Sequence, residues 1–365
     1  MKRVVAVGEI MVRFSSPGFL RLGQCMPGKL EVLFAGAEAS VAMSIAHLGA
    51  QATFVTALPE HAIADACVST LRSVGVDTRH IVRTDQGRLG LYFLEAGANQ
   101  RPSLVIYDRE GSSVALTPPE AYDWDSIFAD ADWLVLSGIT SAISPVGKEL
   151  NRVAAEQASS RGVKILCDFN YRGKLWRWEP TLTPRELALR TIRELLPSLD
   201  LFVGGTDEIC ELLGQPQVPE AADGDPREAF SDVAARLCER FPRLGFVAST
   251  VRKAQSASRQ RLGGMLWDAG AGAVHAAPGT VDRHAAWAEL YDIEQMVDRI
   301  GTGDAFTAGL LFGLITPELA APPRAIAFAT AAFCLAHSVP GDFHFSTRKE
   351  IEALVAGDSS GRVQR

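Results

Sequence analysis

The segment Gly301-Thr302-Gly303-Asp304-Ala305-Phe306 opens a stretch in which a tight glycine turn leads into an apolar run that ends near residue 315. Phe306, Leu310 and Leu314 recur at helical spacing, and two glycines lie between them, which favours a close helix contact. The first amides of such a helix have no partner within the helix and carry partial positive charge. The turn is therefore suited to binding phosphate.

Asp304 has two interpretations at this position. A carboxylate beside a bound phosphate is electrostatically unfavourable, so it needs a chemical role, and accepting a proton from an attacking alcohol is one that fits. The alternative is a helix cap after a glycine turn. The segment is not a Walker A loop, because no Gly-Lys-Ser/Thr ends it. It is not a dinucleotide fingerprint either, because Phe306 stands where the third glycine belongs.

The composition of the chain limits the classes of protein to which it can belong. The 365 residues are 47% hydrophobic and show no internal repeat or linker, which suits one large α/β domain with an insertion. A net charge of −7 argues against nucleic acid as a partner. The six cysteines form no CxxC pair, so buried free thiols are favoured over a zinc site or disulfides. Without a signal peptide before Val4 or a membrane-spanning apolar run, we expect a cytoplasmic protein.

Short apolar runs alternate with helical periodicity along most of the chain. This alternation predicts an α/β fold with a doubly wound, mostly parallel sheet and helices on both faces. We expect strands over residues 4–7, 53–57, 133–136, 163–167, 199–203 and 244–250, and helices over 41–48, 63–74, 148–160, 207–213, 227–241 and 324–337. We expect 252–263 to be irregular, 215–225 to be a surface loop and the tail from 357 to be disordered.

Residues 88–109 interrupt the alternation with a hairpin, extended over 89–94 and again over 103–109. In the second strand Val105, Tyr107 and Arg109 share one face. A tyrosine and an arginine on one face of a hairpin suit a β lid over a ligand, formed by about residues 11–35 and 88–110. The alternative is an ordinary solvated face.

Polar residues also follow the strand expected at 163–167. In Asp168-Phe169-Asn170-Tyr171-Arg172 they occupy every second position, so they could all face a crevice at the carboxyl edge of the sheet. Aspartate and asparagine also favour turns, which is the alternative interpretation.

Together these features resemble the ribokinase-like, or PfkB, family of sugar kinases, with the closest likeness to its 2-keto-3-deoxygluconate kinase branch. The likeness extends from Val4 to Phe343 and implies one kinase domain over residues 1–365. Ala35-Gly36-Ala37-Glu38-Ala39-Ser40 is similar to the first family signature. The segment from Val297 to Phe306 is similar to the second signature, which is the more specific of the two. Asp168 to Trp176 and Tyr291-Asp292-Ile293 are similar to that branch.

The resemblance implies roles for particular residues. Asp304 would be the catalytic base, and the amides of Gly301, Thr302 and Gly303 would form an anion hole. Positions that would contact a sugar acid are Gly36, Tyr92, Tyr107, Arg109, Arg172 and Asp342. Nucleotide contacts would come from Asn170, from Arg252 and from Thr250, where the nucleotide-binding strand would end. Glu208 would be linked indirectly to a metal. ATP and Mg²⁺ are the implied cofactors, a monovalent cation is compatible with them, and a homodimer through the lid is implied.

Two arginines beside the sugar would suit a carboxylate, because guanidinium pairs with it bidentately. The expected activity is therefore ATP-dependent phosphorylation of 2-keto-3-deoxygluconate to its 6-phosphate. A kinase of a neutral sugar such as fructose is one alternative. Another is a sugar-acid-binding protein without catalysis, because Ala35, Ser40 and Gly205 depart from the family signatures and Val251-Arg252-Lys253 replaces a glycine-rich turn.

Overall fold

The computed structural model describes residues 2–217, 225–279 and 290–358. A nine-stranded sheet forms its centre, in the order β14-β13-β12-β11-β10-β9-β1-β4, with β15 pairing to β13. The strands from β4 to β12 in this order pair in parallel, while β13, β14 and β15 pair antiparallel. They are β1 (Arg3–Val7), β4 (Gln51–Val55), β9 (Trp133–Ser137), β10 (Lys164–Asp168), β11 (Leu201–Val203), β12 (Phe246–Ala254), β13 (Gln260–Asp268), β14 (Ala273–Ala277) and β15 (Tyr291–Ile293).

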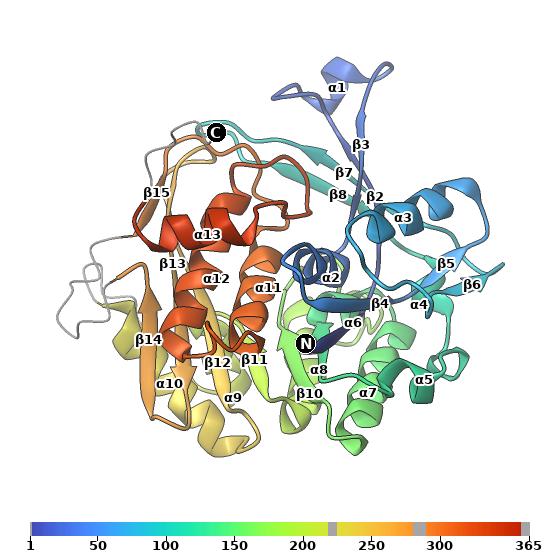
Figure 1. Ribbon diagram of the computed structural model, residues 1–365. Coiled ribbons are helices and arrows are strands. Elements are labelled where there is room, and N and C mark those ends of the chain that lie inside the picture. The colour runs from blue at the N-terminus through green and yellow to red at the C-terminus, as the bar shows by residue number, and fades with distance from the viewer. Residues whose placement is uncertain (1, 218–224, 280–289, 359–365) are drawn as a thin grey trace.

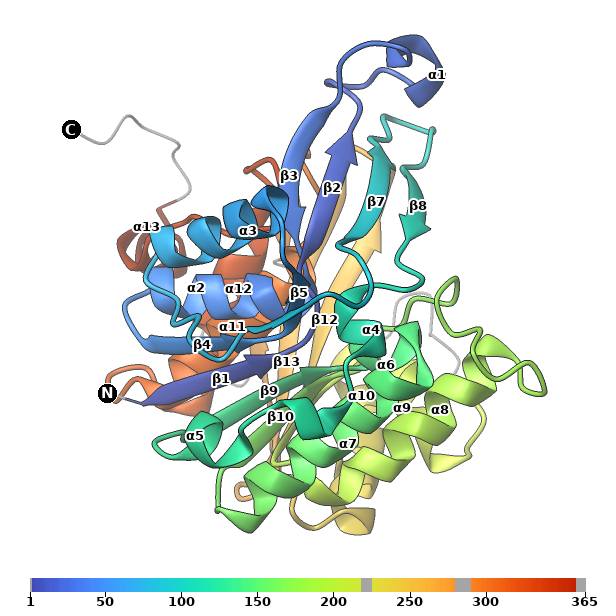
Figure 2. The same cartoon turned by 90° about the vertical axis from the view of Figure 1, so that its right-hand side faces the viewer.

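Helices cover both faces of this sheet, as Figures 1 and 2 show. One face carries α2 (Ala37–His47), α3 (Ala62–Ser73), α11 (Thr302–Ile315), α12 (Pro322–Ala336) and α13 (Arg348–Val355). The other carries α5 (Trp124–Phe128), α6 (Gly138–Ile143), α7 (Pro145–Ser160), α8 (Pro184–Leu195), α9 (Thr206–Leu213) and α10 (Pro226–Arg240). Short elements complete the body: β5 (Ala57–Pro59), β6 (Val82–Thr84), α4 (Ser113–Leu116) and the 3₁₀ turns at Pro119–Ala121 and Leu196–Ser198. The expected doubly wound fold is confirmed.

Helix α11 is held by close packing against α12. A Cβ added at Gly309 would lie 3.0 Å from the Cα of Ala329, and one at Gly313 would lie 2.9 Å from the Cα of Ala325. Larger side chains at these positions would push the helices apart. The two glycines therefore fix the axis of α11, and with it the place of its first turn.

A second sheet of four strands, the small sheet, rises from one edge of the body (Figure 2). Its order is β3-β2-β7-β8, with bounds β2 (Met11–Ser15), β3 (Glu31–Ala35), β7 (Gly90–Glu95) and β8 (Leu104–Asp108). The turn between β7 and β8 reaches the tip of the β12–β13 hairpin. There the amide of Asn99 donates to Ser258 Oγ at 2.9 Å, and the amide of Ala257 donates to the Asn99 carbonyl at 2.7 Å.

The expectation of irregular chain over 252–263 is wrong. Strand β12 continues past Thr250 to Ala254, and β13 begins at Gln260 and pairs with it from end to end. Arg252 and Lys253 are exposed, so the outer half of this hairpin lacks the apolar alternation that marks a strand in sequence. Between β2 and β3 the chain also forms the single helical turn α1 (Leu22–Cys25).

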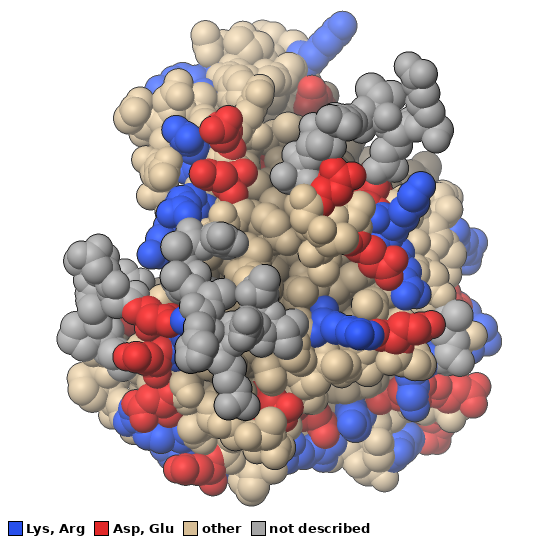
Figure 3. All heavy atoms as spheres, turned by 60° about the vertical axis from the view of Figure 1, so that its left-hand side comes forward, with Lys and Arg blue, Asp and Glu red and all other residues tan. Residues whose placement is uncertain are grey.

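The expected loop over 215–225 and the expected disordered tail lie largely on residues outside the described ranges. On the face in Figure 3, basic and acidic side chains are interspersed over the part not drawn in grey. Among the helices of the described ranges, none is long and apolar enough to cross a membrane.

Candidate active site

A cavity of about 510 Å³ lies where the carboxyl ends of the parallel strands meet the small sheet. Its walls contain residues that lie far apart in the sequence and come together when the chain folds. All but one of the residues expected in a site line it: Gly36, Tyr92, Tyr107, Arg109, Asn170, Arg172, Glu208, Thr250, Arg252, Gly301, Gly303, Asp304 and Asp342. The exception, Thr302, is buried beneath the wall.

The first turn of α11 forms one wall. Gly301 has φ of 76°, and a Cβ there would lie 2.1 Å from the carbonyl oxygen of Asp342, so both backbone angle and space require glycine. The Thr302 hydroxyl donates to the Arg299 carbonyl at 3.0 Å, which braces the turn from behind. The helix amides of this turn therefore open toward the cavity, where they could receive an anion.

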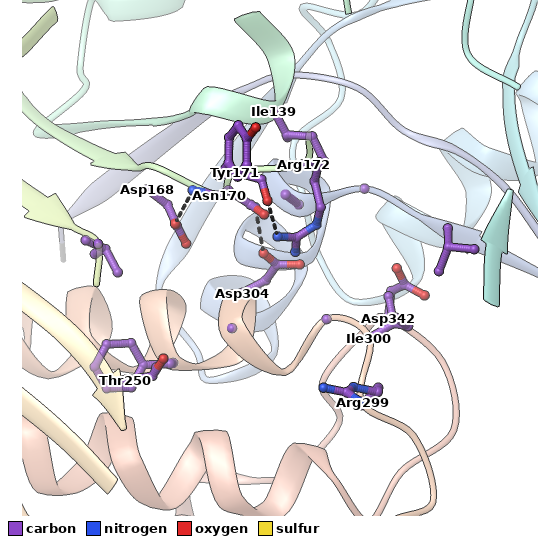
Figure 4. A pocket seen from close by; sticks show the side chains of 18 of the residues that line it. Ile139, Asp168, Asn170, Tyr171, Arg172, Thr250, Arg299, Ile300, Asp304 and Asp342 are labelled. Carbon is purple, nitrogen blue, oxygen red and sulfur yellow. Dashed lines mark hydrogen bonds between the residues drawn. The ribbon is translucent and has the colours of Figure 1, made fainter. Parts of the chain in front are cut away.

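Asp304 lies in this first turn and lines the cavity (Figure 4). Asn170 and Arg172, on the loop after β10, point toward it, and Asn170 Nδ2 donates to Asp304 Oδ1 at 3.5 Å. Burial raises the pKa of Asp304 well above its usual value, the charge of Asp168 raises it further, and Arg172 opposes the shift. A carboxylate with a raised pKa is a stronger base than an exposed one, which suits proton abstraction.

Asp168, at the end of β10, was expected to be able to face a crevice but was given no role in the site, and it lines the cavity with Asp304. Its Oδ2 accepts from the Thr307 hydroxyl at 3.0 Å, and its Oδ1 accepts from the Asn170 amide at 2.9 Å. Burial raises the pKa of Asp168, and the Thr307 hydrogen bond opposes that. Asp168 thus fixes the loop that carries Asn170, whose φ of 41° is unusual for a residue other than glycine.

Besides Arg109, three arginines line the cavity: Arg172, Arg252 and Arg299. Arg252 Nη2 donates to Thr302 Oγ1 at 3.2 Å, and its guanidinium lies 4.7 Å from the centre of the Phe333 ring. Within the described ranges no carboxylate forms an ion pair with any of the three. Arginines without a salt-bridge partner near a helix N-terminus favour an anionic ligand. Arg299 was not among the expected site residues.

Arg109 differs from the expectation for the sugar side. Its Nε and Nη2 both lie 2.5 Å from Glu9 Oε2, and both residues are almost fully buried. The charge of Arg109 is therefore already balanced by Glu9, which the sequence did not mark. Its Nη1 has no hydrogen-bond partner among the described residues and remains available as a donor. Arg172 is thus the stronger attraction for a substrate carboxylate.

Glu208 lines the cavity but also caps its own helix. Its Oε2 accepts from the Gly205 amide at 2.8 Å, and its Oε1 lies 3.7 Å from Arg185 Nη1. Burial raises the pKa of Glu208, and these two contacts oppose the shift. No group of three or more His, Cys, Asp or Glu side chains within the described ranges is arranged to hold a metal. Glu208 and Asp168 instead suit Mg²⁺ that arrives with phosphate oxygens and water, because Mg²⁺ keeps much of its hydration.

A second buried carboxyl lies next to the pair of Arg109 and Glu9. Glu38, in the first turn of α2, is 1% exposed, and its Oε1 accepts from the Thr140 hydroxyl at 2.7 Å. A Cβ at Gly8 would lie 2.2 Å from the Glu38 Cδ, so Gly8 makes the space for it. Burial raises the pKa of Glu38 from 4.5 to about 7, and Thr140 and Arg109 oppose that shift.

This pKa makes stability depend on pH. The folded state holds the Glu38 proton more tightly than the unfolded state, so its contribution is full below about pH 4.5 and is lost as pH rises toward 7. The variant Glu38→Gln carries an amide there, which has no proton to lose in this range. Relative to the wild type, the free energy of unfolding of Glu38→Gln should therefore increase by about 3 kcal/mol between pH 4.5 and 8. Urea denaturation at both pH values measures this. An equal difference at both would contradict it, and the exposed Glu60→Gln is the control.

Comparison with known proteins agrees with this geometry. A model of the pfkB family carbohydrate kinases matches residues 1–235. The 2-dehydro-3-deoxygalactonokinase of Haloferax volcanii is 29% identical over 358 residues, which is 98% of each chain. The crystal structure of 2-dehydro-3-deoxygluconokinase from Thermotoga maritima is 34% identical with a TM-score of 0.85 and covers 98% of this chain and 100% of that one.

A crystal structure of fructokinase with bound ATP from Xylella fastidiosa shares the fold, with a TM-score of 0.73, 19% identity and coverage of 98% of this chain and 99% of that one. The family match covers more than half of the chain, and the relatives above span nearly all of it. The chain therefore belongs to the pfkB family of carbohydrate kinases and is a sugar kinase.

Proposed function

We propose that this protein is an ATP-dependent kinase of 2-keto-3-deoxygluconate and forms its 6-phosphate. The observation that carries the proposal is the position of Asp304. Asp304 belongs to the first turn of α11 and lines the same cavity as Tyr92 and Tyr107 of the small sheet. A base between a sugar-sized space and an anion site is what transfer of a phosphoryl group to an alcohol requires.

In this mechanism Asp304 takes the proton of the substrate's primary hydroxyl. The hydroxyl oxygen then forms a bond to the terminal phosphorus of ATP, the bond from that phosphorus to its bridging oxygen breaks, and ADP leaves. Asn170 donates to this carboxylate, and the nearby charge of Arg172 favours its ionised form. Asp304 stays protonated only briefly, because its proton can pass to water after the product leaves.

Negative charge that develops on the transferred group would meet the amides of Gly301, Thr302 and Gly303. Arg252 and Arg299 would stabilise the nucleotide phosphates from the side of α12, and Thr250 lies on the same side. When bound, Mg²⁺ would neutralise charge on the nucleotide phosphates. Glu208 and Asp168 are the residues placed to hold it through water.

The choice of a sugar acid rests on charge. Arg172 lines the cavity, is exposed and has no carboxylate partner within the described ranges, so its guanidinium could pair with a substrate carboxylate, which a neutral sugar lacks. The sugar acids after which two of the relatives are named, a deoxygalactonate and a deoxygluconate, both carry a carboxylate. The fructokinase shares only the fold, so a neutral sugar remains the alternative substrate.

A coupled assay of ADP release with ATP and Mg²⁺ tests the proposal. The panel is 2-keto-3-deoxygluconate, 2-keto-3-deoxygalactonate, gluconate, fructose and ribose. We expect turnover on keto-deoxy acids, and at least 100-fold less in Asp304→Asn, because proton transfer by a placed group contributes about 10²–10⁴-fold. Full turnover by Asp304→Asn would exclude it as the base. Turnover on fructose alone would favour the neutral-sugar alternative. Tight binding of the acid without ADP release would favour a binding protein.

The raised pKa of Asp304 predicts the pH profile. Activity needs the ionised carboxylate, so kcat/KM should fall on the acid side with a midpoint above the usual 3.8 of aspartate. Because Arg172 lowers the pKa of Asp304, Arg172→Met should shift this midpoint to higher pH. Stopped-flow or steady-state profiles of both proteins measure the shift. Arg177→Met, an exposed neighbour on the same loop, is the control. A midpoint that does not move would contradict the assignment.

We also propose a homodimer formed through the small sheet. Its strands β3 and β8 are unpaired edges, and Val32, Phe14, Phe93 and Ile106 align across all four strands on the face away from the cavity. Val32 and Ile106 are 58% and 46% exposed, and the Phe14 and Phe93 rings stack at 5.3 Å. Contiguous exposed apolar surface and open strand edges both favour pairing with a second copy.

Sedimentation at micromolar concentration tests the dimer. We expect a mass of twice 39.2 kDa for the wild type and a monomer for the double variant Val32→Glu/Ile106→Glu, which adds charge to the face without touching the cavity. Val355→Glu changes a similarly exposed side chain on α13 and should stay dimeric. A monomeric wild type would rule the interface out.

A further inference from the structure

One buried arginine reaches from the small sheet into the loop that precedes α11. Arg13, on β2, is 4% exposed. Its Nη2 lies 2.5 Å from Asp298 Oδ2, its Nη1 lies 2.8 Å from Asp342 Oδ1, and its Nε donates to Ser15 Oγ at 2.8 Å. All three donor nitrogens are therefore used, and two of them bind carboxylates on segments remote from β2 in the sequence.

The first of these carboxylates organises the anion side. Asp298 Oδ1 accepts from the amides of Arg299 at 2.7 Å and Ile300 at 3.1 Å, and its Oδ2 accepts from the Gly341 amide at 3.0 Å. The two amides belong to the residues just before Gly301. Asp298 thus sets the path of the chain into the first turn of α11.

The second carboxylate belongs to the sugar side. Asp342 accepts from the Tyr92 hydroxyl at 2.7 and 2.8 Å, and both residues line the cavity. Its backbone also closes the space beside Gly301. A shift of Asp342 would therefore move both the group that faces the sugar and the backbone against which the anion turn rests.

Electrostatics make Arg13 hard to replace. Asp298 and Asp342 are 8% and 7% exposed, and each would repel the other without a cation between them. Burial alone would lower the pKa of Arg13, but Asp342, Tyr92 and Asp298 together raise it, so the guanidinium stays charged. Lysine keeps the charge but is a single point charge and cannot reproduce the fork that binds two carboxylates at once.

We propose that Arg13 is a positioning residue that couples the sugar side of the cleft to the anion site at the start of α11. It touches neither substrate. When a sugar shifts Tyr92 and Asp342, Arg13 moves with Asp342 and shifts Asp298. The amides of Arg299 and Ile300, which Asp298 binds, then shift as well. Binding of the sugar should then strengthen binding of the nucleotide phosphates, and by linkage the reverse. The coupling between the two ligands rests on the proposed function, whereas the hydrogen bonds by which Arg13 connects Asp298 and Asp342 do not.

The test compares Arg13→Lys with the wild type and with Arg101→Lys. Arg101 lies beside the same sheet and pairs at 2.9 Å with the buried Glu95, a carboxylate of that sheet, so it matches the chemical change without reaching α11. Isothermal calorimetry measures the Kd of ADP with and without the sugar that the wild type phosphorylates best. We expect that sugar to tighten ADP binding about fivefold or more in the wild type and in Arg101→Lys, and less than twofold in Arg13→Lys.

If Arg13 had a purely structural role, Arg13→Lys would weaken the binding of each ligand alone but leave the ratio of the ADP Kd values without and with the sugar unchanged. That result would overturn the proposal. A ratio near one in the wild type would overturn it as well.

Hydrogen exchange of the ligand-free protein is the second readout and needs no substrate. Exchange of the amides at 299 and 300 should be faster in Arg13→Lys than in Arg101→Lys, and unchanged protection there would overturn the proposal. If the wild type phosphorylates nothing in the panel, the proposed function fails while this readout still decides the role of Arg13. If Arg13→Lys does not fold, Asp298→Asn replaces it, because asparagine keeps an acceptor for the two amides but loses the charge that Arg13 binds.

Discussion

The amides in the first turn of α11 have no partner within their helix, and the rest of the cleft is arranged around that fact. Gly301 allows the turn because it packs against the Asp342 backbone and adopts a φ that other residues avoid. Gly309 and Gly313 bring α11 close enough to α12 to fix its axis. The anion site is therefore a property of packing further along the helix as much as of the turn itself.

Charge separates the cleft into two sides. On the anion side, Arg252 and Arg299 have no carboxylate partner within the described ranges, so positive charge remains for phosphate. On the sugar side, nearly every buried charge already has a partner: Arg109 with Glu9, and Arg13 with Asp298 and Asp342. Paired charges can orient a ligand through hydrogen bonds but add little net charge to the cleft, whereas unpaired charges attract ions. Asp304 lies at the boundary, where burial and the charge of Asp168 raise its pKa.

The sequence predicted the doubly wound sheet because its buried strands are short apolar runs between periodic helices, a pattern that burial on both faces imposes. It did not predict the outer half of the β12–β13 hairpin, where Arg252 and Lys253 are exposed and the apolar alternation of a strand is missing. The Gly301–Asp304 turn was recognisable because its glycines and carboxylate are adjacent. Arg13 carried no signal, because its partners lie 285 and 329 residues away.

The same contrast explains why Arg109 was interpreted too simply. An arginine at alternate spacing from a tyrosine indicates which face it shares, and that part needs only the pleat of a strand. Whether its charge is free depends on Glu9, which follows a different strand and meets Arg109 only after both sheets have formed. Local pattern therefore indicates which side chains face a cleft, while the net charge they present depends on long-range pairs. The proposed specificity for a carboxylate follows from the second quantity, so the proposal rests on Arg172 rather than on the number of arginines.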